Sequence, residues 1–197
     1  MNGFTGRVVL FLIVLFWGSL HSLLASHAVK QRLRRGAFLG TDQAYRLAYN
    51  AVAILTFLPV LAALLLTPDV HLFTAGMPLF VFLVLAQLLA VLLLVIGFLQ
   101  TGPLSFLGLA PADEQGGLVT SGLYRFMRHP LYTAGLILIW CMPYMTANSL
   151  TINIALTLYV AIGAMFEEAR LRKVFGQQYL DYARRTPMFL PRLRPRR

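Results

Sequence analysis

The sequence predicts an all-α, polytopic membrane protein with five transmembrane helices, the last two a tight hairpin, followed by an interfacial helix. Three observations predict this fold class. Hydrophobic residues make up 58% of the 197 residues and charged residues only 12%, which is too apolar for a water-soluble domain. The chain is too long for a single span, and polar loops separate its apolar runs. Its Lys and Arg residues gather in a few loops and in the tail.

The first three predicted spans are residues 8–24, 45–66 and 78–99, each long enough to cross a bilayer. A cleaved signal peptide is the alternative for the first of them, because small residues follow its apolar core. A basic cluster at residues 30–35 comes next. Such a cluster resists translocation, so a retained membrane helix is favoured.

The C-terminal half begins with a loop rich in Gly and Pro, at residues 100–122. Residues 131–147 are apolar but short, and Asn148 and Ser149 are expected to turn the chain into the next span, at 150–166. Beyond it, apolar residues recur at three- and four-residue steps among basic ones. This pattern is typical of a helix that lies on the membrane surface.

The basic residues also predict the orientation. Apart from Arg7, the Lys and Arg residues lie soon after the first span, at 30–46, between the long loop and the next apolar run, at 125–128, or after the last predicted span, from 170 onward. With five spans these segments share one side, which is the cytoplasm by the positive-inside rule. We therefore expect an integral protein of a bacterial inner membrane, with its N-terminus outside and its C-terminus and active site in the cytoplasm. Several polar residues would then share the cytoplasmic side: His21, Asn50, Gln100, Arg128, His129, Glu167 and Glu168.

Composition also excludes some classes of partner. The net charge is +10, but the basic residues lie beside apolar runs, so anionic lipid headgroups are favoured over nucleic acid. Cys141 is the only cysteine, which rules out an internal disulfide and a thiolate metal cluster. The four histidines lack the spacing of zinc ligands. No metal is expected, and the sequence does not predict an oligomeric state.

The first candidate site is the sequence Arg128-His129-Pro130. Proline suits the first turn of a helix and disfavours helix at the residue before it. Arg128 and His129 would then lie at a helix mouth, where unpaired N–H groups and the helix dipole attract a carboxylate or a phosphate. The alternative is that Arg125 and Arg128 only snorkel at the membrane edge.

The second candidate site is the pair Glu167 and Glu168, at the end of the fifth span. Carboxylates at membrane depth are costly unless they are paired or functional. Neighbouring helical positions point about 100° apart, so one carboxylate can face a cavity while the other meets a different partner. The alternative is an ordinary i,i+4 ion pair from Glu168 to Arg172. Together the two sites favour a ligand with both a carboxylate and a cation, such as S-adenosylmethionine.

Several motifs carry a resemblance to a known family. They are LVTSGLYRFMRHPLY at 118–132, Glu167-Glu168, Leu171, Phe175-Gly176, Tyr179 and Tyr182. As a set they resemble the integral-membrane methyltransferases that include isoprenylcysteine carboxyl methyltransferase and the phospholipid methyltransferases. HSLLA at 21–25, PYMT at 143–146, FEEARL at 166–171 and PMFLP at 187–191 are most similar to the bacterial methanethiol S-methyltransferases. Compared with those enzymes the N-terminal half of this chain is short.

The resemblance implies an S-adenosylmethionine-dependent methyltransferase with an N-terminal three-helix membrane region at 1–112 and a cofactor-binding region at 113–197. One wall of the cofactor site would consist of Tyr124, Arg128, His129, Pro130 and Tyr132, and the other of Glu167, Glu168 and Arg172. The backbone of Leu118, Val119 and Thr120 would contact the adenosine. The residues expected to take part in catalysis are Arg128, His129 and His21. His21 would reach the acceptor from the first span, unless another helix satisfies it.

A small or lipophilic thiol is the expected methyl acceptor. A thiol must lose its proton, and a nearby sulfonium together with Arg128 favours the thiolate. An isoprenylcysteine-type carboxylate needs no base, whereas a phospholipid amine would need one, with His129 or His21 as the candidate. The remaining alternatives are an NADPH-dependent membrane reductase, because sterol reductases carry a similar C-terminal arrangement, and a non-enzymatic membrane subunit.

Overall fold

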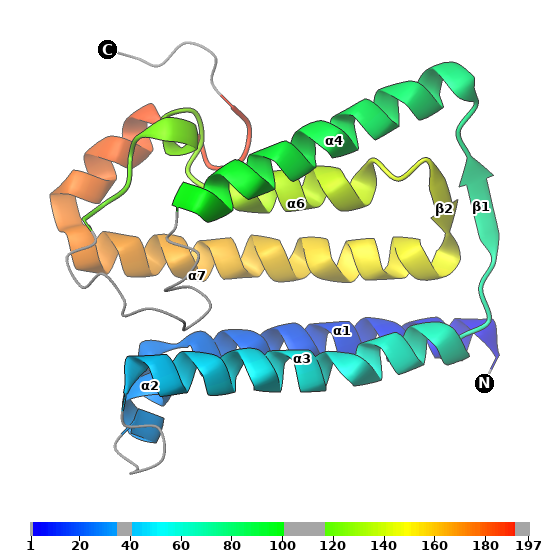
Figure 1. Ribbon diagram of the computed structural model, residues 1–197, viewed down its shortest axis with the longest axis horizontal. Helices are drawn as coiled ribbons and strands as arrows, with labels where there is room; N and C mark the ends of the chain where they lie inside the picture. Colours follow the sequence, from blue (N-terminus) through cyan, green and yellow to red (C-terminus); the bar gives the residue numbers. More distant parts are fainter. Residues whose placement is uncertain (1, 35–40, 101–116, 192–197) are drawn as a thin grey trace. The chain divides into compact units, whose positions relative to one another are not determined.

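The computed structural model describes residues 2–34, 41–100 and 117–191 and is mostly helical (Figure 1). Four of the described helices, α1, α3, α4 and α7, are long and apolar enough to cross a membrane. The chain divides into two compact units. Among the described residues, the first unit holds those up to Ala75 and residues 144–159, and the second holds the rest. The predicted class, a helical polytopic membrane protein, is confirmed, whereas the count of five spans stays a prediction.

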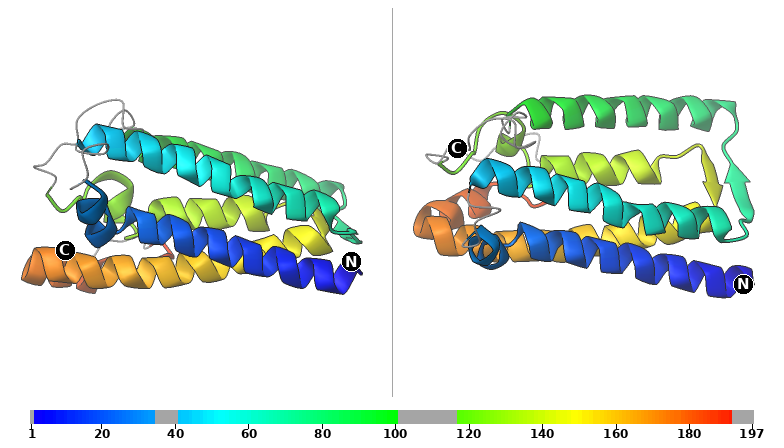
Figure 2. Two further views of the ribbon diagram at one scale, coloured as in Figure 1. Left: turned by 90° about the horizontal axis from the view of Figure 1, so that it is seen from below. Right: turned by 60° about the horizontal axis from the view of Figure 1, so that its bottom comes forward.

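The first unit is built on α1 (Gly3–Ala25) and α3 (Asp42–Leu66), which run alongside each other (Figure 2). Every fourth residue of α1 is buried, from Gly6 through Leu10 and Val14 to Gly18, so these residues share one helix face. Gly18 permits a close approach, because a Cβ there would lie 2.6 Å from Cδ2 of Tyr159. Leu10 and Val14 pack with Val60 and Ala155 in the core.

A short helix, α2 (His27–Arg34), follows α1. Ser26 separates the two helices: its hydroxyl donates to the Leu23 carbonyl at 2.6 Å and accepts from the amide of Val29 at 3.4 Å. Residues 35–40 and 101–116 lie outside the described residues, and the second range makes up most of the loop predicted at 100–122.

Two short strands were not predicted from the sequence. β1 (His71–Thr74) pairs antiparallel with β2 (Tyr144–Thr146). Next to them, the Asp69 carboxylate accepts from the amides of Val70 at 2.8 Å and Asn148 at 3.0 Å, and so caps the start of α7. Burial raises the pKa of the Asp69 carboxyl, but hydrogen bonds from Thr146 and from these two amides outweigh burial and hold the pKa below its usual value.

The second unit contains α4 (Met77–Gln100), the 3-10 turn η2 (Gly122–Arg125) and α6 (Pro130–Trp140). α4 and α6 lie side by side (Figure 1). They approach closely at Gly97, where a Cβ would lie 2.4 Å from Cδ2 of Leu131. Further along, the Gln87 amide donates to the Leu138 carbonyl at 3.0 Å. That carbonyl is among the last four of α6, which have no partner within the helix.

The helix α7 (Ala147–Arg185) is 39 residues long and takes in both the predicted fifth span and the predicted surface helix. At Gly176 its backbone leaves helical geometry, with φ 53° and ψ −126°, and the chain turns there (Figure 1). The predicted helix at 131–147 ends instead at Trp140. Pro143 follows, and Asn148 and Ser149 lie in the first turn of α7, not in the loop before it.

Candidate active site

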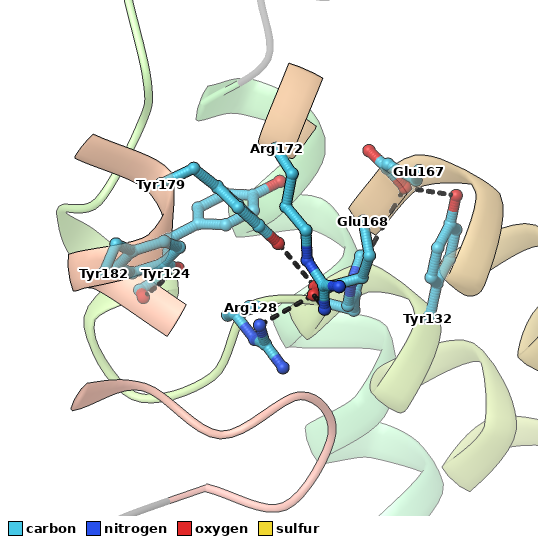
Figure 3. A network of polar contacts seen from close by, with 9 residues as sticks. Tyr124, Arg128, Tyr132, Glu167, Glu168, Arg172, Tyr179 and Tyr182 are labelled. Carbon is cyan, nitrogen blue, oxygen red and sulfur yellow. Dashed lines mark hydrogen bonds and ion pairs between the residues drawn. The ribbon is translucent and has the colours of Figure 1, made fainter. Parts of the chain in front are cut away.

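The loop before α6 has the conformation that its proline imposes. Pro130 is the first residue of α6, as predicted, and His129 before it has φ −124° and ψ 62°, which lie outside the helical region that a following proline disfavours. Arg128 and His129 are thereby directed toward α7, where Glu167 and Glu168 lie (Figure 3). The structure thus brings the two candidate sites of the sequence together within the second unit.

Glu168 is the centre of this network, and its residue is 4% exposed. Its Oε2 accepts from Arg128 Nη1 at 2.7 Å and lies 3.5 Å from Arg172 Nη2. Its Oε1 accepts from the Tyr179 hydroxyl and lies 2.9 Å from His129 Nε2. A carboxylate offers about four lone-pair sites, so these four contacts fill its hydrogen-bonding capacity.

Glu167 has a different environment. Its side chain is 39% exposed, and its Oε2 accepts from the Tyr132 hydroxyl at 2.8 Å and lies 3.7 Å from His129 Nδ1. Burial, and then the charge of Glu167, raise the pKa of Tyr124, so that phenol stays protonated near the carboxylate. No described residue donates to Oε1 of Glu167. The two glutamates therefore meet different partners, as their helical spacing predicted.

The segment after α7 covers the start of α6. The amides of Arg128 and His129 donate to the carbonyls of Pro187, at 2.9 Å, and Met188, at 3.1 Å. The His129 ring stacks on the ring of Tyr132, with centroids 5.3 Å apart, and also contacts the ring of Phe189, at 5.8 Å. The amides of Arg128 and His129, which precede the helix, are therefore paired with backbone carbonyls from 59 residues further along the chain. The unpaired N–H groups expected in the first turn of α6 stay a prediction.

The remaining candidate residues make none of the hydrogen bonds described above for Glu167 and Glu168. Leu118, Val119 and Thr120 lie in irregular chain ahead of η2. His21 belongs to the first unit, where it hydrogen-bonds to the hydroxyl of Tyr49 and stacks on Trp17 at 5.4 Å. The hydrogen bond from α3 corresponds to the alternative given for His21, in which a residue of another helix is its hydrogen-bond partner. In the part of the chain that the structure describes, no three His, Cys, Asp or Glu side chains gather as metal ligands would. The absence of a metal stays a prediction.

Tyr179 was not predicted to be a site residue. In the structure it is fully buried, and its hydroxyl donates a hydrogen bond to Glu168. The available signal was Gly176, three residues earlier in a helical pattern, because a glycine there permits a turn. Tyr182 on the same segment donates to the Tyr124 carbonyl at 2.6 Å.

The fold and the site define a class. A carboxylate within an apolar helix is rare and usually functional, so Glu168, buried in α7 against Arg128 and His129, indicates the functional site of a polytopic membrane protein. The chain belongs to the phospholipid methyltransferase family, whose model matches residues 73–178, more than half of its length. The resemblance that the motifs predicted is thereby confirmed.

Curated relatives agree with this membership. The chain is 45% identical to methanethiol S-methyltransferase 2 of Bradyrhizobium diazoefficiens over 75 residues. This aligned segment covers 38% of this chain and 29% of that protein. The chain is 38% identical over 84 residues to methanethiol S-methyltransferase of Pseudomonas deceptionensis, covering 43% and 31%. Protein-S-isoprenylcysteine O-methyltransferase B of Arabidopsis thaliana is 33% identical over 87 residues, covering 40% and 42%.

The matches to the two methanethiol methyltransferases span less than a third of the length of those proteins. No solved structure matches the chain.

Proposed function

We propose that this protein is an integral-membrane S-adenosylmethionine-dependent methyltransferase that acts on a small or lipophilic thiol. The observation that carries the proposal is the meeting of the Arg128-His129 loop with Glu167 and Glu168 in a family whose relatives are named methyltransferases. The thiol is favoured because the methanethiol S-methyltransferases named above are more similar to the chain than the plant isoprenylcysteine enzyme is.

Two polar groups of the network support this cofactor. Oε1 of Glu167 accepts no hydrogen bond from the described residues, and its side chain is 39% exposed. Nε of Arg128 is buried and has no hydrogen-bond partner among the residues that the structure describes. A free carboxylate oxygen suits the ammonium of S-adenosylmethionine, and a free guanidinium N–H suits its carboxylate. NADPH offers no cation to the glutamate.

The position of His129 bears on the acceptor. S-adenosylmethionine, when bound, supplies a methyl group on a sulfonium for in-line displacement. Both ring nitrogens of His129 face carboxylates, Nε2 at 2.9 Å from Glu168 and Nδ1 at 3.7 Å from Glu167, and the residue is 5% exposed. Such a histidine orients its neighbours and is poorly placed to take a proton from an amine. An acceptor that needs no protein base, a thiolate or a carboxylate, fits this geometry better.

We also propose five membrane crossings, the last two a hairpin, with residues 113–197 as the cofactor-binding region and residues 1–112 as the membrane region beside it. α6 has 11 residues, about 16 Å of helix. This crossing would therefore need residues outside the helix as well to span the roughly 30 Å of a hydrocarbon core. The last turns of α7 would lie on the cytoplasmic surface, since their exposed side chains include both Val174 and Arg184.

The cofactor is tested by calorimetric titration of the purified protein with S-adenosylhomocysteine. We expect Glu167→Gln to weaken binding by about tenfold or more, since losing a charged contact costs about 1.5 to 3 kcal/mol. Asp181→Asn is the matched control, because this carboxylate lies on the same helix with its side chain 49% exposed and pairs with Arg184. Equal affinity in both variants and the wild type would place the cofactor elsewhere.

The acceptor is tested with labelled S-adenosylmethionine and four acceptors in one detergent: methanethiol, a longer alkyl thiol, a prenylcysteine analogue and phosphatidylethanolamine. We expect the thiols to be labelled preferentially, at a rate that rises with pH until the bound thiol is ionised. Preferential labelling of the prenylcysteine carboxylate or of the phospholipid would refute the thiol while keeping the methyltransferase.

The topology is tested by reporter fusions in a bacterial host. We expect an alkaline phosphatase fused after the last residue to be inactive and a fluorescent protein at the same place to be bright. An active phosphatase would place the C-terminus in the periplasm and reverse the proposed orientation.

A further inference from the structure

Tyr179 reaches Glu168 only because the chain folds back. The two residues are 11 positions apart, which in a straight helix would separate their backbones by about 16 Å along the axis. Gly176 lies between them with φ 53° and ψ −126°, and the last turns of α7 beyond it change direction. The Tyr179 hydroxyl then donates to Oε1 of Glu168 (Figure 3).

The contact completes the partners of Glu168. Arg128, His129 and Arg172 provide three of its four close contacts, and Tyr179 provides the fourth. Tyr179 is 0% exposed, whereas the Arg172 side chain is 57% exposed. A buried hydrogen bond from a rigid ring restrains the carboxylate much more than an exposed, flexible ion pair does.

We propose that Tyr179 is a positioning residue: it holds Glu168 against Arg128 and His129, and so leaves Glu167 as the carboxylate that meets the cofactor. This inference rests on the proposed function. Without the Tyr179 hydroxyl, Oε1 of Glu168 would have an unfilled lone-pair site. Glu168 would then compete with Glu167 for the ammonium group of S-adenosylmethionine. The loss acts on cofactor affinity, because the hydroxyl that Tyr179→Phe would remove is hydrogen-bonded to Glu168.

Tyr182 is the matched comparison. It lies on the same segment, its ring centroid is 6.0 Å from that of Tyr179, and its hydroxyl also makes one hydrogen bond. Its acceptor is the backbone carbonyl of Tyr124, at 2.6 Å, and not a carboxylate. A purely structural role for both tyrosines, which would be to dock the end of α7, would make their phenylalanine variants equivalent.

The test compares Tyr179→Phe and Tyr182→Phe in the full-length protein. We expect Tyr179→Phe to raise the Kd for S-adenosylhomocysteine and the KM for S-adenosylmethionine by about tenfold, the effect of one hydrogen bond to a charged group. The KM for the thiol acceptor should stay within about twofold. Tyr182→Phe should change the cofactor constants by less than about threefold. Equal changes in the two variants, or wild-type constants in Tyr179→Phe, would overturn the proposal.

A second measurement needs no ligand. Stability is measured for Tyr179→Phe and Tyr182→Phe, each alone and combined with Glu168→Gln. We expect Tyr179→Phe to be non-additive with Glu168→Gln and Tyr182→Phe to be additive, since only the first pair is in contact. If the wild type binds no S-adenosylhomocysteine, the proposed function fails, and this coupling alone decides the role of Tyr179. Additivity of both pairs would refute that role.

Discussion

Substitution of Gly176 gives the sharpest test of the fold at the site. Its φ of 53° and ψ of −126° match the first central residue of a type II′ turn, a conformation dominated by glycine. A Cβ at Gly176 would meet no atom within 4 Å, so Gly176→Ala causes no clash and costs only backbone strain. That strain amounts to about 1 to 3 kcal/mol.

Gly163 is the matched control on the same helix. A Cβ there would also meet nothing within 4 Å, but its backbone is helical, with no positive φ. Gly163→Ala is therefore expected to stabilise by up to about 1 kcal/mol, the helix propensity difference between the two residues. The two variants should differ by about 1 to 4 kcal/mol and change stability in opposite directions.

The assay is unfolding in detergent, followed by tryptophan fluorescence and by binding of S-adenosylhomocysteine. For a chain of this size, each 1 kcal/mol shifts Tm by about 2 to 4 °C. Gly176→Ala should also weaken cofactor binding, because Tyr179 depends on the turn. Equal shifts of the same sign in both variants would refute the reasoning that the backbone at Gly176, and not the space around it, requires glycine.

Three further predictions follow from contacts away from the site. Gln87→Leu removes the donor to the Leu138 carbonyl and should destabilise by about 0.6 to 2 kcal/mol, as polar contacts between membrane helices do, measured by the same unfolding assay. Gly18→Ala would place a Cβ 2.6 Å from the Tyr159 ring and should cost about 1 to 3 kcal/mol, whereas Gly135→Ala, with open space around it, should not. Asp69 has a folded-state pKa below its usual 3.8, so its contribution to stability is fully present above about pH 4 and is lost as the pH falls through the folded-state pKa. Asp69→Asn should lower stability at pH 7 and flatten the acid side of the stability profile, and a profile unchanged from wild type would contradict this.

The apolar runs and the proline at the start of α6 could be predicted from the sequence, because each depends on local chemistry. Span length follows from hydrophobicity, and Pro130 fixes a helix start whatever lies around it. The different partners of Glu167 and Glu168 also follow from helical geometry alone. These are the features that the structure reproduces most closely.

Features that depend on contacts between segments far apart in the sequence could not be predicted in this way. The strands β1 and β2 are four and three residues long and join segments about 70 residues apart. The carbonyls of Pro187 and Met188 that meet Arg128 and His129 come from a proline-rich tail, for which the sequence predicts only irregular chain. No periodicity in the sequence reports either pairing.

The shortness of α6 has a consequence for how the protein is made. A segment that enters a bilayer independently needs about 20 apolar residues, and α6 has 11. In the proposed topology of five crossings, α6 would therefore enter against a helix that is already in place. α4 precedes it in the chain and contacts it at Gly97 and Gln87. Substitutions on this face of α4 act on the newly synthesised chain as well as on the folded one, so they should reduce the yield of inserted protein before any loss of stability can be measured.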